Sequence, residues 1–147
     1  MTASYLGFDY GLRRIGVAVG QSLTATAQPL TTISSHQQKP DWDAIADLIS
    51  TWRPEGLVVG IPVHMDGQEQ PITQAARKFC RQLHGRFQLP VFEMDERLSS
   101  MEAEHLIAQQ RATGQHKKTQ KSDIDKMAAQ LILQSWLQQQ ELDKHDK

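Results

Sequence analysis

Three groups of acidic residues stand at points of the sequence where several chain segments could bring them together. Asp9 ends one apolar run, Asp95 and Glu96 end another, and Asp123 or Asp125 opens the last helical pattern. Side chains at the ends of neighbouring strands converge at one edge of an α/β sheet. Crowded carboxylates repel one another unless a cation is present, and oxygen ligands favour Mg²⁺ or Mn²⁺ over zinc. Two such ions about 4 Å apart would stabilise the attacking and the leaving oxygen in phosphodiester cleavage.

Each of these acids also has a purely structural explanation. Asp9 and Gly11 are both common in turns, and Ser122 with Asp125 has the spacing of a helix capping box. Asp125 is a better candidate than Asp123, because the positions one and two turns after Asp125 are apolar whereas those after Asp123 are mostly polar. We therefore expect Asp125 to face the sheet. It is the joint arrangement of the acids that indicates a function.

Hydrophobic periodicity predicts the elements that would position these acids. Strands are expected at about 5–8, 15–19, 24–33, 57–61 and 89–94, and helices at about 41–52, 73–84, from Ser99 onward, and 123–142. Asp41 is the expected cap of the first helix, and Arg53-Pro54 its expected end. Pro29 indicates an edge or a bulge in the third strand. The order of elements predicts a mixed five-stranded α/β sheet flanked by helices, with the first strand central and beside the fourth.

The composition indicates an ordinary globular chain. Of its 147 residues 39% are hydrophobic and 22% charged, and we expect one domain over 1–147 whose last residues, from about 139, fray. The sequence contains no apolar run of membrane-spanning length and no secretory signal, so we expect a cytoplasmic protein. Cys80 is in phase with the apolar positions of the helix at 73–84, which predicts core packing. The lack of a long exposed apolar stripe favours a monomer, although symmetric cleavage of two strands would need a two-fold dimer.

The net charge of −1 means that any site for a polyanion must be local. The polar segment 111–121 is the clearest candidate, and its cations are Arg111, Lys117, Lys118 and Lys121. Arg13 and Arg14, on the expected first turn, are further candidates for phosphate binding. Arg97 could clamp either the preceding carboxylate or a phosphate through its planar guanidinium. A solvated loop is the competing interpretation of 111–121, since charge runs in loops are usually only that.

Four segments, taken in order, resemble the YqgF (RuvX) family of nucleases over nearly the whole chain. They are FDYGLRRIGVAVG, VVGIPVHMDGQEQP, DERLSS and KSDIDKMAAQLILQSWL. The resemblance implies a ribonuclease H-like fold and a metal-dependent endonuclease that processes the 5′ end of pre-16S ribosomal RNA. It also implies an alternative, a Holliday junction resolvase related to RuvC. The family's acidic positions fall on Asp9, Glu96 and Asp125.

One feature departs from the wider superfamily. Many ribonuclease H-like enzymes carry an acid at the end of the fourth strand, where this chain has Gly60-Ile61-Pro62. Asp66, later in the same loop, and Asp95 are therefore the remaining candidates for a further metal ligand. The choice between them stays open.

Other chemistries lack their motifs. The sequence contains no G-x-S-x-G elbow, no H-E-x-x-H helix, no cysteine pair and no Walker lysine. The Asp9-Tyr10-Gly11 turn is similar to the phosphate-binding hairpin of actin-like and sugar-kinase ATPases, but those enzymes need a second lobe. Two hypotheses remain, a metal-dependent nuclease and a nucleic-acid-binding ribosome-assembly factor that cuts little. The presence of all three acids favours the nuclease.

Overall fold

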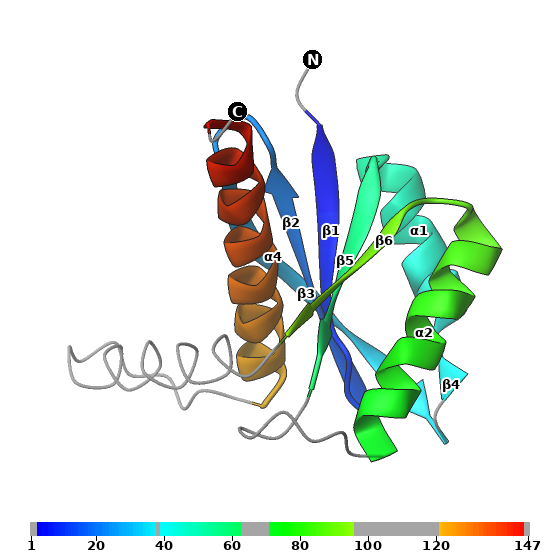
Figure 1. The fold of residues 1–147 in the computed structure, drawn as a ribbon. Helices are drawn as coiled ribbons and strands as arrows, with labels where there is room; N and C mark the ends of the chain where they lie inside the picture. Colours follow the sequence, from blue (N-terminus) through cyan, green and yellow to red (C-terminus); the bar gives the residue numbers. More distant parts are fainter. Residues whose placement is uncertain (1–2, 38, 63–70, 96–120, 146–147) are drawn as a thin grey trace.

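The computed structural model describes residues 3–37, 39–62, 71–95 and 121–145. Within these residues the chain forms six strands and three helices (Figure 1). In chain order they are β1 (Ser4–Asp9), β2 (Arg14–Gln21), β3 (Thr26–His36), β4 (Lys39–Pro40), α1 (Trp42–Trp52), β5 (Gly56–Ile61), α2 (Pro71–Phe87), β6 (Val91–Asp95) and α4 (Lys121–His145). The helix expected from Ser99 lies outside the described residues.

The strands form a mixed sheet in the order β4-β3-β2-β1-β5-β6. β1 pairs antiparallel with β2 and parallel with β5, and β6 is parallel to β5. The predicted central place of the first strand, beside the segment 57–61, is therefore confirmed. The predicted number of five strands was one too few, because β4 pairs with Ser35 and His36 at the end of β3. A strand of two residues is too short to leave a periodic signal.

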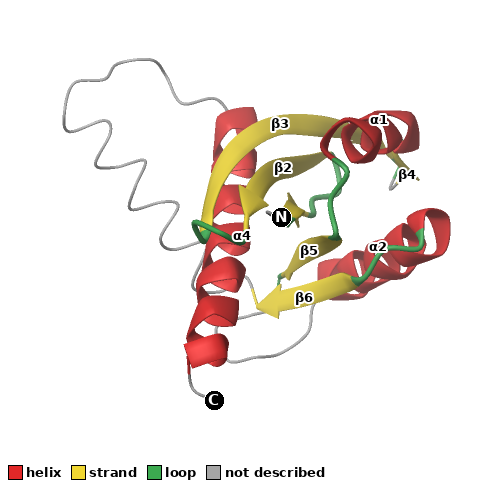
Figure 2. Cartoon of the chain, turned by 90° about the horizontal axis from the view of Figure 1, so that it is seen from above, coloured by secondary structure: helices red, strands yellow, loops and turns green. Residues whose placement is uncertain are grey.

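The sheet lies between two layers of helices. Figures 1 and 2 show α1 and α2 on one face and α4 on the other. Side chains alternate between the faces along each strand, so that Leu6 and Phe8 pack with α1 and α2 while Ala18 and Val58 pack under α4. All six residues of β5 are buried, as expected for a strand covered on both faces. None of the described helices is long and apolar enough to cross a membrane.

Local chemistry explains where the helices begin and end. The Asp41 carboxylate accepts a hydrogen bond of 3.1 Å from the backbone N–H of Ala44, which confirms the predicted cap of α1. Arg53 closes α1 in the left-handed conformation, and its N–H donates to the Ile49 carbonyl at 2.8 Å. Helix α2 is longer than predicted and begins at Pro71, a residue suited to the first helical position. Helix α4 runs on to His145, beyond the predicted end near residue 142.

The outer edge of β3 is covered by α4 rather than left open. The Ala27 N–H donates to Gln134 Oε1 at 3.3 Å, and Gln130 Nε2 donates to the Ala27 carbonyl at 3.0 Å. Pro29 lies opposite Ala18, next to a register shift between Val17 and Ala18. The prediction that this proline marks a bulge or an edge is therefore confirmed. Covering the edge protects the strand from pairing with another chain.

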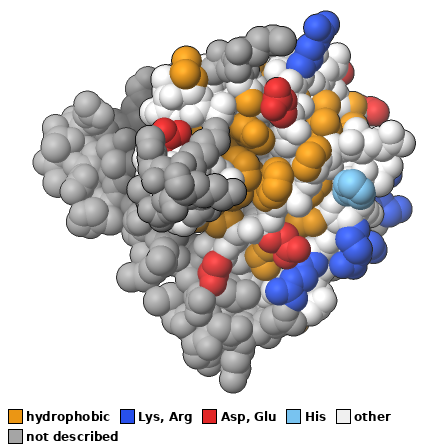
Figure 3. Space-filling view, turned by 45° about the horizontal axis from the view of Figure 1, so that its top comes forward, with side chains coloured by type: hydrophobic (Ala, Val, Ile, Leu, Met, Phe, Trp, Pro, Cys, Tyr) orange, Lys and Arg blue, Asp and Glu red, His pale blue; other side chains and the backbone are white. Residues whose placement is uncertain are grey.

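Aromatic side chains line the outer side of the α4 face. Trp136 of α4 contacts Tyr5 of β1 with ring centroids 5.0 Å apart and Phe92 of β6 with centroids 4.8 Å apart. Phe92 is 37% exposed, and Figure 3 shows hydrophobic side chains gathered on the face that it draws. This surface does not decide the oligomeric state, so the monomer expected from the sequence stays a prediction.

Candidate functional site

The carboxylate of Asp9 lies on the face of the sheet that α4 covers. Two residues earlier in β1, a Cβ on Gly7 would be 2.7 Å from Leu133 Cβ of α4, and two residues before that Tyr5 contacts Trp136. Residues two apart in a strand share a face, so Asp9 continues this row toward the first turns of α4. Figure 1 shows the end of β1 and the start of α4 at the same end of the sheet.

Glycines flank Asp9 on both neighbouring strands. Gly16 of β2 is its antiparallel register partner, and Gly60 of β5 is its parallel one. Directly opposed residues share a face of the sheet, so the two positions next to the carboxylate carry no side chain. The absence of a side chain at Gly16 is what allows the backbone of α4 to come close to this position.

Asp125 reaches the same place from α4. A Cβ on Gly16 would lie 2.0 Å from the backbone oxygen of Asp125, so the helix backbone rests directly on β2 at the register partner of Asp9. The prediction that this side of the helix packs on the sheet is confirmed, since Ala128, Ala129, Ile132 and Leu133 are buried. Gly16 therefore has Asp9 as its partner on β1 and the backbone of Asp125 packed over it.

An ion pair joins Asp125 to the β1–β2 hairpin. Arg14 Nε donates to Asp125 Oδ2 at 2.8 Å, and the two side chains are 40% and 23% exposed. Helix α4 begins at Lys121, before Ser122, and the Asp125 carboxylate bonds to β2. Both observations argue against the capping box of Ser122 and Asp125. Arg14 and Asp125 are separate candidates in the sequence, and the structure joins them.

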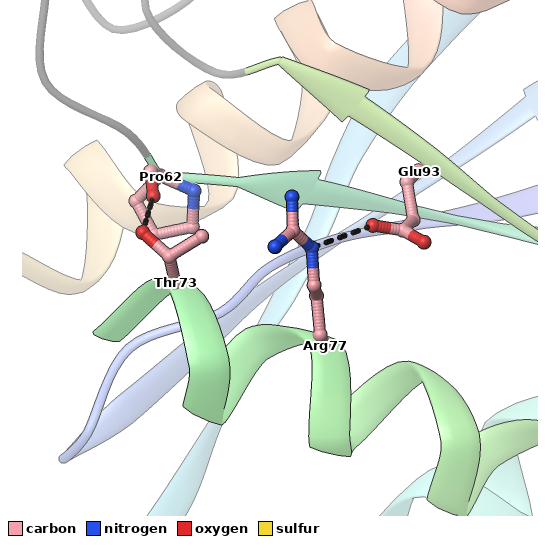
Figure 4. A network of polar contacts seen from close by, with 4 residues as sticks. All are labelled: Pro62, Thr73, Arg77 and Glu93. Atoms are coloured by element: carbon pink, nitrogen blue, oxygen red, sulfur yellow. Dashed lines mark hydrogen bonds and ion pairs between the residues drawn. The ribbon is translucent and has the colours of Figure 1, made fainter. Parts of the chain in front are cut away.

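Asp95 lies on the opposite face of the sheet from Asp9. Its register partner is Ile61, which belongs to the core under α1 and α2. Asp95 lines a shallow pocket of about 180 Å³ together with Arg77 and Glu93, which form an ion pair of 3.4 Å. Figure 4 shows this pair, with Arg77 reaching from α2 to Glu93 of β6. The structure thus does not bring Asp95 to the place where Asp9 and Asp125 meet.

Several predicted site residues lie outside the part of the chain that is described. They are Asp66, Glu96, Arg97, Arg111, Lys117 and Lys118. Lys121 is the first residue of α4, and only its backbone is described. Arg13 lies exposed on the turn between β1 and β2, where its carbonyl accepts a hydrogen bond of 3.0 Å from the Ser35 N–H. The roles predicted for all of these residues stay predictions.

Two other titratable groups are held neutral in the core. Burial raises the pKa of the Cys80 thiol to about 12, and Cys80 is packed as predicted. Burial also raises the pKa of Tyr10, whose ring contacts Phe79 at a centroid distance of 5.1 Å. Tyr10 follows Asp9 directly but points to the other face of the sheet, with α1 and α2. Neither group can serve as a nucleophile or as a base at neutral pH.

Asp9 and Asp125 both carry carboxylate oxygens, which are donors that suit a hard divalent cation. Among the described residues no group of three or more His, Cys, Asp or Glu side chains is placed to hold a metal ion. Asp9 and Asp125 belong to the described residues and Glu96, the third acid predicted from the sequence, does not, so the predicted set of three ligands stays a prediction. The carboxylate oxygens of these residues fit Mg²⁺ or Mn²⁺, and Glu96 would complete the predicted set of ligands.

Known proteins resemble this chain over almost its full length. A sequence profile of the RuvX family, described as Holliday junction resolvase, matches residues 3–139. A protein of Nitrosococcus oceani with the name "Putative pre-16S rRNA nuclease" is 51% identical over 141 residues, which are 95% of this chain and 90% of the relative. A protein of Legionella pneumophila with the same name is 49% identical over 137 residues, or 93% of this chain and 96% of the relative.

Solved structures resemble the fold at much lower identity. Thermus thermophilus RuvC in complex with a Holliday junction substrate is 15% identical with a TM-score of 0.57, over 95% of this chain and 96% of that one. The fowlpox virus resolvase is 13% identical with a TM-score of 0.57, over 93% of this chain and 98% of that one. These likenesses confirm the predicted ribonuclease H-like fold. Together with the matching profile and the close relatives, they lead to the conclusion that this chain belongs to the RuvX family.

Proposed function

We propose that this protein is a nuclease that hydrolyses phosphodiester bonds at the edge of the sheet where Asp9 and Asp125 meet. The observation that supports the proposal is the contact at Gly16, where the backbone of Asp125 in α4 lies against the register partner of Asp9. The substrate we propose is the 5′ end of the precursor of 16S ribosomal RNA, in the cytoplasm. The names of the relatives from Nitrosococcus oceani and Legionella pneumophila support this substrate.

Asp9, Asp125 and Glu96 would hold Mg²⁺ or Mn²⁺, and a pair of ions is the arrangement we propose. Such ions polarise a phosphate and lower the pKa of a bound water so that it becomes a nucleophile. The protein's own contribution would be to position the carboxylates that hold these ions. The close contact of α4 with Gly16 would hold the backbone of Asp125 against β2, and Gly60 would add no side chain beside Asp9 on the other neighbouring strand.

Cations of the chain would bind the nucleic-acid backbone. Arg13 and Arg14 lie on the hairpin that ends in the site, and the segment 111–121 adds Arg111, Lys117, Lys118 and Lys121. Contacts to phosphate position a nucleic acid without reading its sequence, and each one increases the salt dependence of binding. Arg97 stays a candidate for the same role. We propose that the protein works as a monomer on RNA.

The test is cleavage of precursor 16S ribosomal RNA in the presence of Mn²⁺ by purified wild type and variants. We expect Asp9→Asn and Asp125→Asn to lose cleavage by at least about a hundredfold while their melting temperatures stay close to that of wild type. Asp47→Asn, an exposed acid of α1, is the matched control and should cut normally. Cleavage that survives both substitutions, or that persists with chelator, would refute the proposed site.

Resolution of four-way DNA junctions is the second candidate, and the description of the family profile favours it. A resolvase must cut two strands symmetrically and therefore needs a two-fold dimer. Junction cleavage measured beside precursor RNA cleavage, with the molar mass determined by light scattering, separates the two functions. Binding of both substrates with cleavage of neither would instead indicate an assembly factor.

A further inference from the structure

The ion pair of Arg14 and Asp125 joins parts of the chain that are 111 positions apart in sequence. Arg14 is the first residue of β2, at the end of the hairpin, and Asp125 lies near the start of α4. The contact uses a single guanidinium nitrogen, Nε, and a single carboxylate oxygen, Oδ2. The carboxylate that we assign to a divalent cation is thus held by an arginine in the structure described here.

An arginine differs from the other cationic side chains in one respect that matters here. A lysine or histidine can lose its proton and so withdraw its charge, but a guanidinium keeps its charge at any pH that a protein tolerates. When a divalent cation binds Asp125, the positive charge of Arg14 must therefore either stay close to it or move away. These alternatives predict opposite effects of removing the arginine.

If Arg14 stays, its role is to orient the carboxylate, and its removal would weaken cation binding. If it moves, it competes with the cation, and its removal would strengthen cation binding. The geometry favours movement. One N–H···O contact fixes a carboxylate less firmly than the paired contacts of a bidentate fork, and Arg14 is 40% exposed, so its side chain has solvent to move into. Repulsion between two like charges at one carboxylate acts in the same direction.

We propose that Arg14 is an exchangeable counter-ion of Asp125, which it neutralises while the cation is absent and leaves for a nucleic-acid phosphate when the cation binds. This inference rests on the proposed function. Phosphate is the group that the freed guanidinium can bind in its planar, bidentate geometry. The exchange makes cation and nucleic acid promote each other's binding, because each favours the state in which Arg14 has left Asp125.

The first test is Mn²⁺ binding by calorimetry at low ionic strength, without nucleic acid. Arg14→Gln should bind Mn²⁺ about tenfold more tightly than wild type, the effect of one neighbouring unit charge on a carboxylate. Arg13→Gln removes the same charge from the adjacent, exposed position and should change the affinity by less than about twofold, the usual size for a screened surface charge. Unchanged or weaker Mn²⁺ binding by Arg14→Gln overturns the proposal.

A second variant keeps the test decisive if Arg14→Gln unfolds. Arg14→Lys retains the charge and should bind Mn²⁺ within about threefold of wild type, since a lysine still repels the cation. A tenfold gain in Arg14→Lys would mean that charge is not the cause, and the proposal would fail. Melting temperatures, measured on the same samples, show that both variants are folded.

The third measurement addresses the coupling. A fluorescent single-stranded RNA with cleavage-resistant phosphorothioate linkages is titrated with protein, with and without Mn²⁺. Wild type should gain more RNA affinity from Mn²⁺ than Arg14→Gln does, because only the wild type releases an arginine. Equal gains in the two proteins count against the exchange.

Asp125→Asn separates this inference from the proposed function. If Asp125→Asn binds Mn²⁺ as wild type does, the cation site itself is misplaced and both proposals fail. If Asp125→Asn loses Mn²⁺ while Arg14→Gln shows no gain, the cation site stands and only the counter-ion role of Arg14 is refuted.

Discussion

The two faces of the sheet are built from different kinds of residue. The face under α1 and α2 carries large side chains, among them Leu6, Phe8, Ile15 and Val17, all fully buried. Four of the alternate positions of the same strands, on the face under α4, are glycine or alanine, namely Gly7, Gly16, Ala18 and Gly20, and Tyr5 and Asp9 share this face. On one side of β1 and β2, large side chains separate the sheet from α1 and α2, and we call this the thick side. On the other side the backbone of α4 lies close to the strands, and we call this the thin side.

The two faces therefore differ in how they contribute to the stability of the fold and to the position of α4. On the thick side, apolar area removed from water stabilises the fold. On the thin side, the helix comes so close that a Cβ on Gly20 would lie 2.7 Å from Leu137 Cδ1, and one on Gly16 would overlap the backbone of Asp125. The contact also buries apolar side chains of α4, among them Ile132 and Leu133, and it sets how closely the backbone of α4 approaches β1 and β2. Substitutions on the two faces should therefore have different consequences.

The largest expected loss of stability comes from Phe79→Ala on the thick side. Phe79 lies in α2, is buried, and contacts the rings of Phe8, Tyr10 and Trp42 at centroid distances of 5.7, 5.1 and 5.7 Å. Truncation should lower the free energy of unfolding by about 3–5 kcal/mol, measured in urea. The folded fraction should still bind Mn²⁺ with wild-type affinity. A parallel loss of Mn²⁺ affinity would show that the two faces are not separable.

Gly16→Ala should have a smaller effect on stability and a larger one on the site. The new methyl group would lie 2.0 Å from the Asp125 carbonyl, so backbone must move against backbone. We expect a loss of about 1–3 kcal/mol and a fall in Mn²⁺ affinity measured by calorimetry.

Gly7→Ala is the matched control for Gly16→Ala. It lies on the same face, but its closest clash, at 2.7 Å, is with the Leu133 side chain, farther along α4 from Asp125. It should lose stability and keep its Mn²⁺ affinity. Equal Mn²⁺ affinities for the Gly16 and Gly7 variants would mean that the seat of α4 on Gly16 does not place Asp125.

Local rules explain the parts of this fold that the sequence predicted. The cap at Asp41, the strand at 57–61 and the sheet-facing side of α4 each depend on residue types within a few positions. The bulge or edge at Pro29 could likewise be predicted, because a proline has no N–H to donate to a neighbouring strand. The central place of the first strand followed from the order of the elements.

The missed features depend on contacts between segments that are distant in sequence. The pairing of Arg14 with Asp125 exists only once α4 has docked, and no local pattern indicates it. The turning away of Asp95 depends on the register of β6 against β5, which pairs Asp95 with Ile61. One available signal was overlooked. Glycine or alanine at alternate positions of the first two strands indicates a helix packed directly on that face.

The thiol of Cys80 provides a smaller effect on the thick side. Its pKa is raised by burial from the ordinary 9.0 to about 12. Between these pH values the unfolded chain releases the thiol proton while the folded chain keeps it. The contribution of the thiol to the free energy of unfolding is therefore fully present below pH 9 and is lost as the pH rises. The expected slope approaches 1.4 kcal/mol per pH unit, about one proton's worth. Urea unfolding across this range should show a steeper loss of stability with pH in wild type than in Cys80→Ala, since the raised pKa of Tyr10 contributes to the loss in both proteins.

The smallest effect on stability is expected at Gly85, a glycine that packs against no other element. Gly85 lies exposed in α2, and a Cβ there would meet nothing within 4 Å. Alanine restricts the unfolded chain and favours helix, so Gly85→Ala should raise the free energy of unfolding by about 0.5 kcal/mol, at the lower end of the usual range because the helix ends at Phe87. The expected result is a higher urea midpoint with an unchanged m-value. If Gly85→Ala and Gly7→Ala instead lost equal stability, loss of glycine in general would explain both, and the close packing of α4 would not be needed to explain the cost at Gly7.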